Sequence, residues 1–268
     1  MKSYTVTMLP IRFEDIGPDD ILRLIEDRTS ERKSLEYKEA LNIGPDNERA
    51  EFLADVSSFA NASGGDIIFG IADERDEDGN PTVIPDAIVP LQIGNPATER
   101  ARIEQIIESG IQPRIPVAEV KTIDIPEQGL VIVIRIGKSW LTPQMVNFKN
   151  RTRFFSRNST GKRQLDIQEI GAAFALQRGL GERLRAWRAD RVSKAISGEG
   201  PMPMEGSQMI LHFVSASALT SDSVALPRVF DHKKWGIDFS LMTGNPQYTR
   251  YNADGFLLAY NDAPKTPP

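Results

Sequence analysis

The chain has 268 residues, of which 40% are hydrophobic and 26% are charged, a balance typical of a globular protein with a sizeable core. It has no cysteine and two histidines, which excludes disulfide frameworks, thiolate zinc sites and cysteine nucleophiles. The formal net charge of −5 argues against a protein that coats nucleic acid by bulk charge.

The first part of the chain predicts alternating helices and strands. Residues 17–19, Gly-Pro-Asp, begin an amphipathic helix, and residues 34–38 alternate as a short strand. A second helix is predicted over about 48–62, because its apolar residues recur at helical spacing and Ser63-Gly64-Gly65 would end it. Residues 66–71 follow as a buried strand.

The next hundred residues continue this mixture. We expect a helix over 98–109, two strands over 117–125 and 130–136 joined by a turn, and a short strand over 153–155. Asp166 is the predicted N-cap of a further helix. This order predicts an α+β fold, with a mixed sheet and flanking helices.

The chain is expected to divide into four parts. An N-terminal segment over 1–17 precedes a folded domain over 18–178. A helical connector and linker over 179–206 leads to a small C-terminal α/β unit over 207–268. That last unit looks too small to close its own core, which predicts that it is incomplete. Strands are expected there over 209–214 and 256–260, and the tail over 264–268 is expected to be disordered.

Carboxylates and a lysine gather in the segment ERKSLEYK at 31–38. Because side chains two apart on a strand share a face, Glu36 and Lys38 project together. A carboxylate beside a lysine suits metal-dependent hydrolysis, in which the carboxylate holds Mg²⁺ or Mn²⁺ and the lysine orients or deprotonates water. A solvated edge strand with a surface ion pair is the plainer interpretation, because Glu-x-Lys is common.

A second informative segment is FANASGG at 59–65, followed by DIIFGIAD at 66–73. A helix end that leads into a core strand accounts for these residues without any chemistry. The same segment places Asp73 at the carboxyl end of the strand, where sites gather in α/β sheets.

Six basic residues and no acid lie between positions 148 and 163, a segment that we call the basic strip: Lys149, Arg151, Arg153, Arg157, Lys162 and Arg163. Phenylalanines stand among them, and arginine interleaved with aromatic residues suits phosphate contact and base stacking. A β-hairpin with a charged outer face is the alternative. By alternation, at least one of Phe154 and Phe155 would then point inward.

The segment Gly137-Lys138-Ser139 has the form of the end of a nucleotide-binding P-loop. That motif needs a further glycine five residues earlier, where the sequence has Ile132 inside a predicted strand. The segment is therefore predicted to be a turn after a strand.

Taken together, the segments 31–38, 59–74 and 153–163 resemble the Schlafen-type AlbA domain family, over about 18–178. In animal Schlafens that cleave transfer and ribosomal RNA, three acids form a metal-dependent nuclease site. Two of these acids lie five residues apart, and the third follows the glycine-bounded strand. The resemblance implies that Glu31, Glu36 and Asp73 hold the metal, Mg²⁺ or Mn²⁺, and that Lys38 orients the water.

The resemblance also implies partners. It favours a divalent-metal-dependent endoribonuclease that acts on structured RNA such as transfer RNA, with RNA favoured over DNA as the ligand. The animal proteins carry a zinc site for which this chain lacks cysteine, and they pair two lobes where this chain has one. A homodimer would supply the second lobe. Because the N-terminus lacks a signal peptide and no stretch would span a bilayer, we expect a cytoplasmic protein without membrane contact.

Two alternatives stay open at this point. Bacterial relatives imply a non-catalytic DNA-binding or ATP-binding transcriptional regulator, in which the same acids are structural. A pure oligomerisation module is the third class. Acids that share an open cleft with the basic strip would favour the enzyme, whereas an acid buried in an ion pair would favour the regulator.

Overall fold

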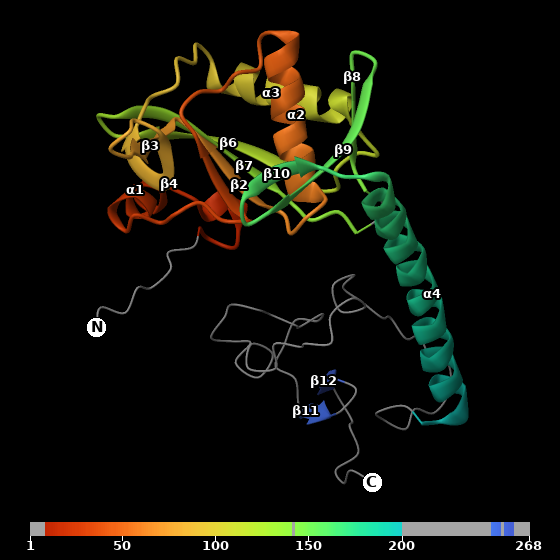
Figure 1. The fold of residues 1–268 in the computed structure, drawn as a ribbon. Coiled ribbons are helices and arrows are strands. Elements are labelled where there is room, and N and C mark those ends of the chain that lie inside the picture. Colours follow the sequence, from red (N-terminus) through yellow and green to blue (C-terminus); the bar gives the residue numbers. More distant parts are fainter. Residues whose placement is uncertain (1–8, 141–142, 200–247, 253–254, 260–268) are drawn as a thin grey trace. The chain divides into compact units, whose positions relative to one another are not determined.

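The computed structural model describes residues 9–140, 143–199, 248–252 and 255–259 (Figure 1). The chain separates into two compact units, Met1–Gln177 and Arg178–Pro268. The described part of the second unit contains a two-stranded antiparallel sheet, β11 (Tyr248–Asn252) with β12 (Gly255–Ala259). None of the helices in the described ranges is long and apolar enough to cross a bilayer.

A central four-stranded sheet organises the first unit, in the order β1-β2-β7-β6. Strand β1 (Leu35–Lys38) runs parallel to β2 (Gly65–Phe69), which is antiparallel to β7 (Gly129–Ile136). Strand β6 (Ala118–Ile125) pairs with β7 across the turn that the sequence predicted.

Both faces of this sheet are buried, and the side chains of β7 show it by alternation. Ile132 and Ile134 belong to one core cluster, whereas Val131 and Val133 belong to another. Helices α2 (Asp46–Ala60) and α3 (Pro96–Gly110) cover the first face, and α1 (Pro18–Glu26) covers the second (Figure 1). A short 3₁₀ helix, η1 (Phe13–Asp15), precedes α1.

A second sheet packs beside α2, in the order β10-β9-β8-β5. Its strands have the bounds β5 (Ile111–Gln112), β8 (Met145–Phe148), β9 (Arg151–Asn158) and β10 (Gly161–Gln164). A separate hairpin joins β3 (Ile71–Arg75) to β4 (Pro81–Ile88), with irregular register around Asp73. Helix α4 (Ile167–Ser197) follows β10 and continues beyond the first unit.

The FANASGG segment forms the joint between the two sheets. The side chain of Asn61 accepts from the Gln144 backbone N–H at 2.6 Å and donates to the carbonyls of Gln144 and Phe155 at 2.7 and 2.8 Å. Gly64 has a φ of +70°, and a Cβ there would lie 2.7 Å from the carbonyl oxygen of Ile136. A Cβ on Gly65 would clash with the backbone of Ser34. The amide and the glycines are thus required by backbone contacts.

The predicted fold class and most of the predicted elements are confirmed. Asp166 caps α4 as expected, because its Oδ1 accepts from the backbone N–H groups of Gln168 and Glu169, each at 2.8 Å. Gly137-Lys138-Ser139 follows β7 as irregular backbone and not as the predicted turn, because its N–H groups bond to distant carbonyls: Gly137 donates to Val117 at 2.9 Å and Ser139 to Ala60 at 2.8 Å. Helix α4 also differs from the expectation: it is a single helix of 31 residues where the sequence predicted a helix and a separate connector.

Several expectations fall outside the described residues. These are most of the linker up to residue 206, the strand over 209–214 and the tail over 264–268. The strand predicted over 256–260 is present as β12.

Candidate functional site

Strand β1 turns its polar side chains toward α2. Leu35 and Tyr37 lie in the core cluster beneath α1, and alternation therefore places Glu36 and Lys38 on the opposite face. This is the face that α2 covers, and β1 is the edge strand of the sheet. The predicted common face for Glu36 and Lys38 is therefore confirmed.

Glu36 is held by two cations. Its Oε1 lies 2.5 Å from Nζ of Lys38, and its Oε2 accepts from the Arg157 guanidinium at 2.6 Å. The guanidinium of Arg157 lies over the ring of Phe59, 3.7 Å from its centroid. Glu36 and Arg157 are 8% and 6% exposed, so this ion pair is buried. Burial acts to raise the pKa of Glu36, but Lys38 and Arg157 outweigh it and hold that pKa below its usual range.

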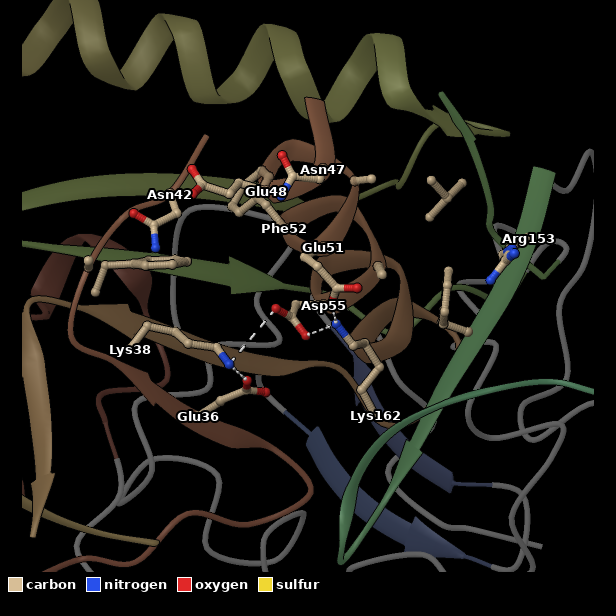
Figure 2. Close-up of a pocket in the computed structure, with 16 residues that line it drawn as sticks. Glu36, Lys38, Asn42, Asn47, Glu48, Glu51, Phe52, Asp55, Arg153 and Lys162 are labelled. Carbon is tan, nitrogen blue, oxygen red and sulfur yellow. Dashed lines mark hydrogen bonds and ion pairs between the residues drawn. The ribbon is translucent and has the colours of Figure 1, made fainter. Parts of the chain in front are cut away.

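A carboxylate from the middle of α2 extends this arrangement. Asp55 is 9% exposed, and its two oxygens lie 2.8 Å from Nζ of Lys162 and 3.9 Å from Nζ of Lys38. Lys162 also contacts Glu51 at 2.5 Å. Burial and the charge of Glu36 raise the pKa of Asp55. We call the whole set the charge network: Glu36, Lys38, Glu51, Asp55, Arg157 and Lys162. Figure 2 shows all of these residues except Arg157, along one side of a pocket.

The other two predicted acids lie near the network. Glu31 accepts the backbone N–H of Tyr37 at 2.7 Å, and burial, followed by the charges of Glu36 and Asp73, raises its pKa to about 7. Burial, together with the charges of Glu36 and Glu39, raises the pKa of Asp73 to about 6. The Oδ1 of Asp73 is buried and has no hydrogen-bond partner within the described ranges. The structure therefore brings Glu31, Glu36 and Asp73 within electrostatic reach of one another.

These carboxylates provide the oxygen ligands that a hard divalent cation prefers, but they do not converge on one cation position in the described residues. Oxygen ligands suit Mg²⁺ and Mn²⁺, and the buried Oδ1 of Asp73 has no hydrogen-bond partner in the described part of the chain. Both oxygens of Glu36, however, are engaged by Lys38 and Arg157. In the part of the chain that the structure describes, no group of three or more histidine, aspartate or glutamate side chains is placed to hold a metal ion.

The basic strip is largely matched by carboxylates from other elements. Arg157 and Lys162 belong to the charge network, Lys149 lies 3.3 Å from Asp46, and Arg163 lies 2.5 Å from Glu169. Arg153 is exposed and donates to the neutral amide of Gln164 at 3.1 Å. The side chain of Arg151 lies outside the described residues. The strip was free of acids in the sequence because its partners come from β1, α2 and α4.

Each phenylalanine of the strip packs against another part of the fold. Phe148 and Phe155 pack against the core under α2. Alternation along β9 required at least one of Phe154 and Phe155 to point inward, and Phe155 does so. Phe154 makes an edge-to-face contact with Phe174 of α4, with ring centroids 6.2 Å apart. All three rings are only partly exposed.

A pocket of about 700 Å³ opens beside the charge network (Figure 2). Lys38, Asp55 and Lys162 lie at one end, and Asn42, Asn47 and Glu48 lie at the other. Glu36, Glu51, Arg153 and apolar groups complete its lining, and the apolar part consists of Ala40, Ala50, Phe52, Ala54, Phe69, Val146 and Phe155.

Sequence reasoning missed two members of the site, Glu51 and Asp55. Asp55 stands on the buried face of α2 between Phe52 and Phe59, where the helical pattern predicts an apolar residue. A carboxylate on a buried helix face needs a cationic partner. The position of Asp55 in the helical pattern could therefore have indicated a buried ion pair from the sequence alone.

The fold and the site define an α+β domain with a buried network of carboxylates and cations at a sheet edge. A family model described as Schlafen, AlbA_2 matches residues 31–166, about half of the chain. The chain belongs to the Schlafen AlbA_2 family, as the motifs predicted.

Two solved structures are similar at a distance. The N-terminal domain of an ATP-dependent DNA helicase RecG-related protein from Nitrosomonas europaea is 17% identical over 46% of this chain and 74% of that chain, with a TM-score of 0.35. The DIP2311 protein from Corynebacterium diphtheriae is 19% identical over 50% of this chain and 22% of that chain, with a TM-score of 0.32. Both are too distant to inform the function. A search of curated proteins gave no match.

Proposed function

We propose that the protein binds nucleic acid and cleaves structured RNA, such as transfer RNA, with the help of Mg²⁺ or Mn²⁺. Membership of the Schlafen AlbA_2 family supports nucleic-acid binding. Arg153 and Lys162 line a pocket beside the predicted catalytic residues, and they are suited to contact phosphate. RNA is favoured over DNA, as the resemblance implied.

The observation that carries the catalytic part is the buried Oδ1 of Asp73, which has no hydrogen-bond partner among the described residues. The pKa of Asp73 is raised to about 6 and that of Glu31 to about 7, chiefly because these carboxyl groups are buried and with a contribution from neighbouring carboxylates, whereas Lys38 acts in the opposite direction. A divalent cation would be held by the Oδ1 of Asp73, by an oxygen of Glu31 and, after rearrangement, by an oxygen of Glu36. Such a cation would supply a Lewis acid for the phosphoryl oxygen. The Lys38 ammonium would orient the attacking water.

Cleavage of labelled transfer RNA and DNA in Mn²⁺ or EDTA tests this proposal. The native protein is expected to cut transfer RNA in Mn²⁺ and to be inactive in EDTA. Asp73→Asn should lose activity by about a hundredfold or more. Asp86→Asn changes the same charge at an exposed position of the same hairpin and should behave like the native protein. Cleavage in EDTA, or equal activity in both variants, would contradict the metal site.

A second candidate function is supported by the buried pair of Glu36 and Arg157. Glu36 is buried in an ion pair, the arrangement expected of the regulator, and an acid held in this way fits a structural role in a non-catalytic DNA-binding or ATP-binding regulator. In that case the protein would bind nucleic acid or ATP without cleaving RNA in Mn²⁺, and Asp73→Asn would leave binding unchanged.

We also infer that two copies of the chain act together. The related animal enzymes use two lobes, and a C2 homodimer would provide the second. Nucleic acid held between Arg153 of the two copies would favour that dimer, because this exposed guanidinium donates to a neutral amide and has no carboxylate partner among the described residues. Light scattering with and without a short RNA tests this: a monomer that still cleaves RNA would contradict the inference.

A further inference from the structure

The pocket beside the charge network combines opposite charges in nearly equal number. Four carboxylates line it, from Glu36, Glu48, Glu51 and Asp55, and three cations, from Lys38, Arg153 and Lys162. The small excess of negative charge opposes a ligand that brings several negative charges. A ligand with a single negative charge, which displaces one of the carboxylates, is compatible with this lining.

Lys162 is the cation best placed for such an exchange. Buried Asp55 fixes it at 2.8 Å, while its second partner, Glu51, has a side chain that is 75% exposed. Exposed ion pairs contribute little stability, so an incoming anion can replace Glu51 while Asp55 keeps Lys162 in position. Arg153, also on the pocket wall, donates to Gln164 and is not paired with a carboxylate of any residue that the structure describes.

The opposite end of the pocket offers a different chemistry. The exposed amides of Asn42 and Asn47 gather there with the carboxylate of Glu48, next to the ring of Phe52 (Figure 2). An amide presents both donors and acceptors, as does the edge of a nucleobase. The apolar wall, which includes Phe155, provides a surface for a planar ring.

We propose that this pocket holds one unpaired nucleotide of a nucleic-acid strand. Its phosphodiester group replaces Glu51 at Lys162 and contacts Arg153, and its base lies at the amide end. The inference rests on the proposed nucleic-acid binding and goes further, because it assigns a base subsite and a displaceable counter-ion. A phosphodiester brings one negative charge, whereas a free nucleoside triphosphate brings several, so the lining favours a strand.

Fluorescence anisotropy with two single-stranded RNAs of equal length tests the base subsite. One RNA carries its bases and the other is abasic, so that both have the same charge. The native protein is expected to bind the first about tenfold more tightly. Asn42→Ala/Asn47→Ala, at exposed positions, should reduce this ratio to within about twofold while binding of the abasic strand is unchanged.

The counter-ion is tested with Glu51→Gln. This variant should bind both RNAs a few-fold more tightly and lose affinity more steeply with salt, because Lys162 then gains a full phosphate contact. The control is Glu108→Gln, an exposed glutamate on α3 paired with Arg114 at 3.7 Å and outside the pocket lining. It changes the net charge equally and should match the native protein.

Several results would overturn the inference. These are equal affinity for the two RNAs, a base preference that survives Asn42→Ala/Asn47→Ala, or equal effects of Glu51→Gln and Glu108→Gln. Displacement of the RNA by ATP at a lower concentration than by unlabelled RNA would show a free-nucleotide pocket instead. Binding of transfer RNA without any base preference would refute the subsite alone. Failure to bind any RNA or DNA would refute the proposed function as well.

Discussion

The partly buried carboxyl group of Glu31 allows a prediction that depends on pH. Glu31→Gln keeps an oxygen that can accept the Tyr37 backbone N–H but removes the ability to ionise. The groups that act on Glu31 are Glu36 and Asp73, which oppose its charge, and Lys38, which favours it. Burial is the largest of these effects and also opposes the charge.

The sign and size follow from the pKa of about 7, compared with an ordinary value of 4.5. The folded protein holds this proton more tightly than the unfolded chain, so the associated stability is present at low pH and is lost as pH rises to about 7. The full shift would correspond to roughly 3 kcal/mol. Since Glu31 is only partly buried, solvent screening reduces this, and we expect about 1–2 kcal/mol.

Urea unfolding at pH 5 and pH 8 measures this contribution. Glu31→Gln should be close to the native protein at pH 5 and more stable by about 1–2 kcal/mol at pH 8. Glu119→Gln, at an exposed position of β6, should show no such gain. If Glu31→Gln lowered stability equally at both pH values, the raised pKa of Glu31 would be refuted.

Three further predictions concern the network and the joint. Millimolar Mn²⁺ should raise the melting temperature of the native protein but not of Glu36→Gln/Asp73→Asn, and equal shifts would count against the metal site. Arg157→Ala should cost about 3 kcal/mol in urea unfolding because it leaves Glu36 buried beside Lys38 alone, whereas exposed Arg153→Ala should cost less than about 0.5 kcal/mol. Asn61→Ala removes three hydrogen bonds to backbone groups and should cost about 2–3 kcal/mol by thermal unfolding; a smaller loss than for Arg153→Ala would refute its role as a joint.

Local patterns predicted the parts of the fold that depend on near neighbours. The alternation of β7, the proline-initiated helix α1 and the Asp166 cap each follow from a few consecutive residues. Strand β4 was missed because its sequence, PTVIPDAI, contains two prolines that argue against a strand. Strands β5, β8 and β10 were missed because segments of two to four residues carry too little periodicity.

The sequence predicted which residues of β1 belong to the site, but it did not predict which residues they pair with. Glu36 and Lys38 share a face because they are two residues apart, which sequence establishes. The partner of Glu36, Arg157, is 121 residues away, and its buried position follows from how β9 packs against α2. For the same reason the basic strip looked unopposed in sequence although Asp55 and Glu51 neutralise Lys162.

The joint formed by FANASGG has a consequence for recognising relatives of this chain. Asn61, Gly64 and Gly65 are required by backbone groups, and none of them contacts Glu31, Glu36 or Asp73 through a hydrogen bond or ion pair in the described residues. A descendant could therefore exchange all three acids and still need the same amide and glycines to fold. The motif identifies the architecture, whereas under the proposed function a relative's capacity for hydrolysis would be judged from the residues at positions 31, 36 and 73.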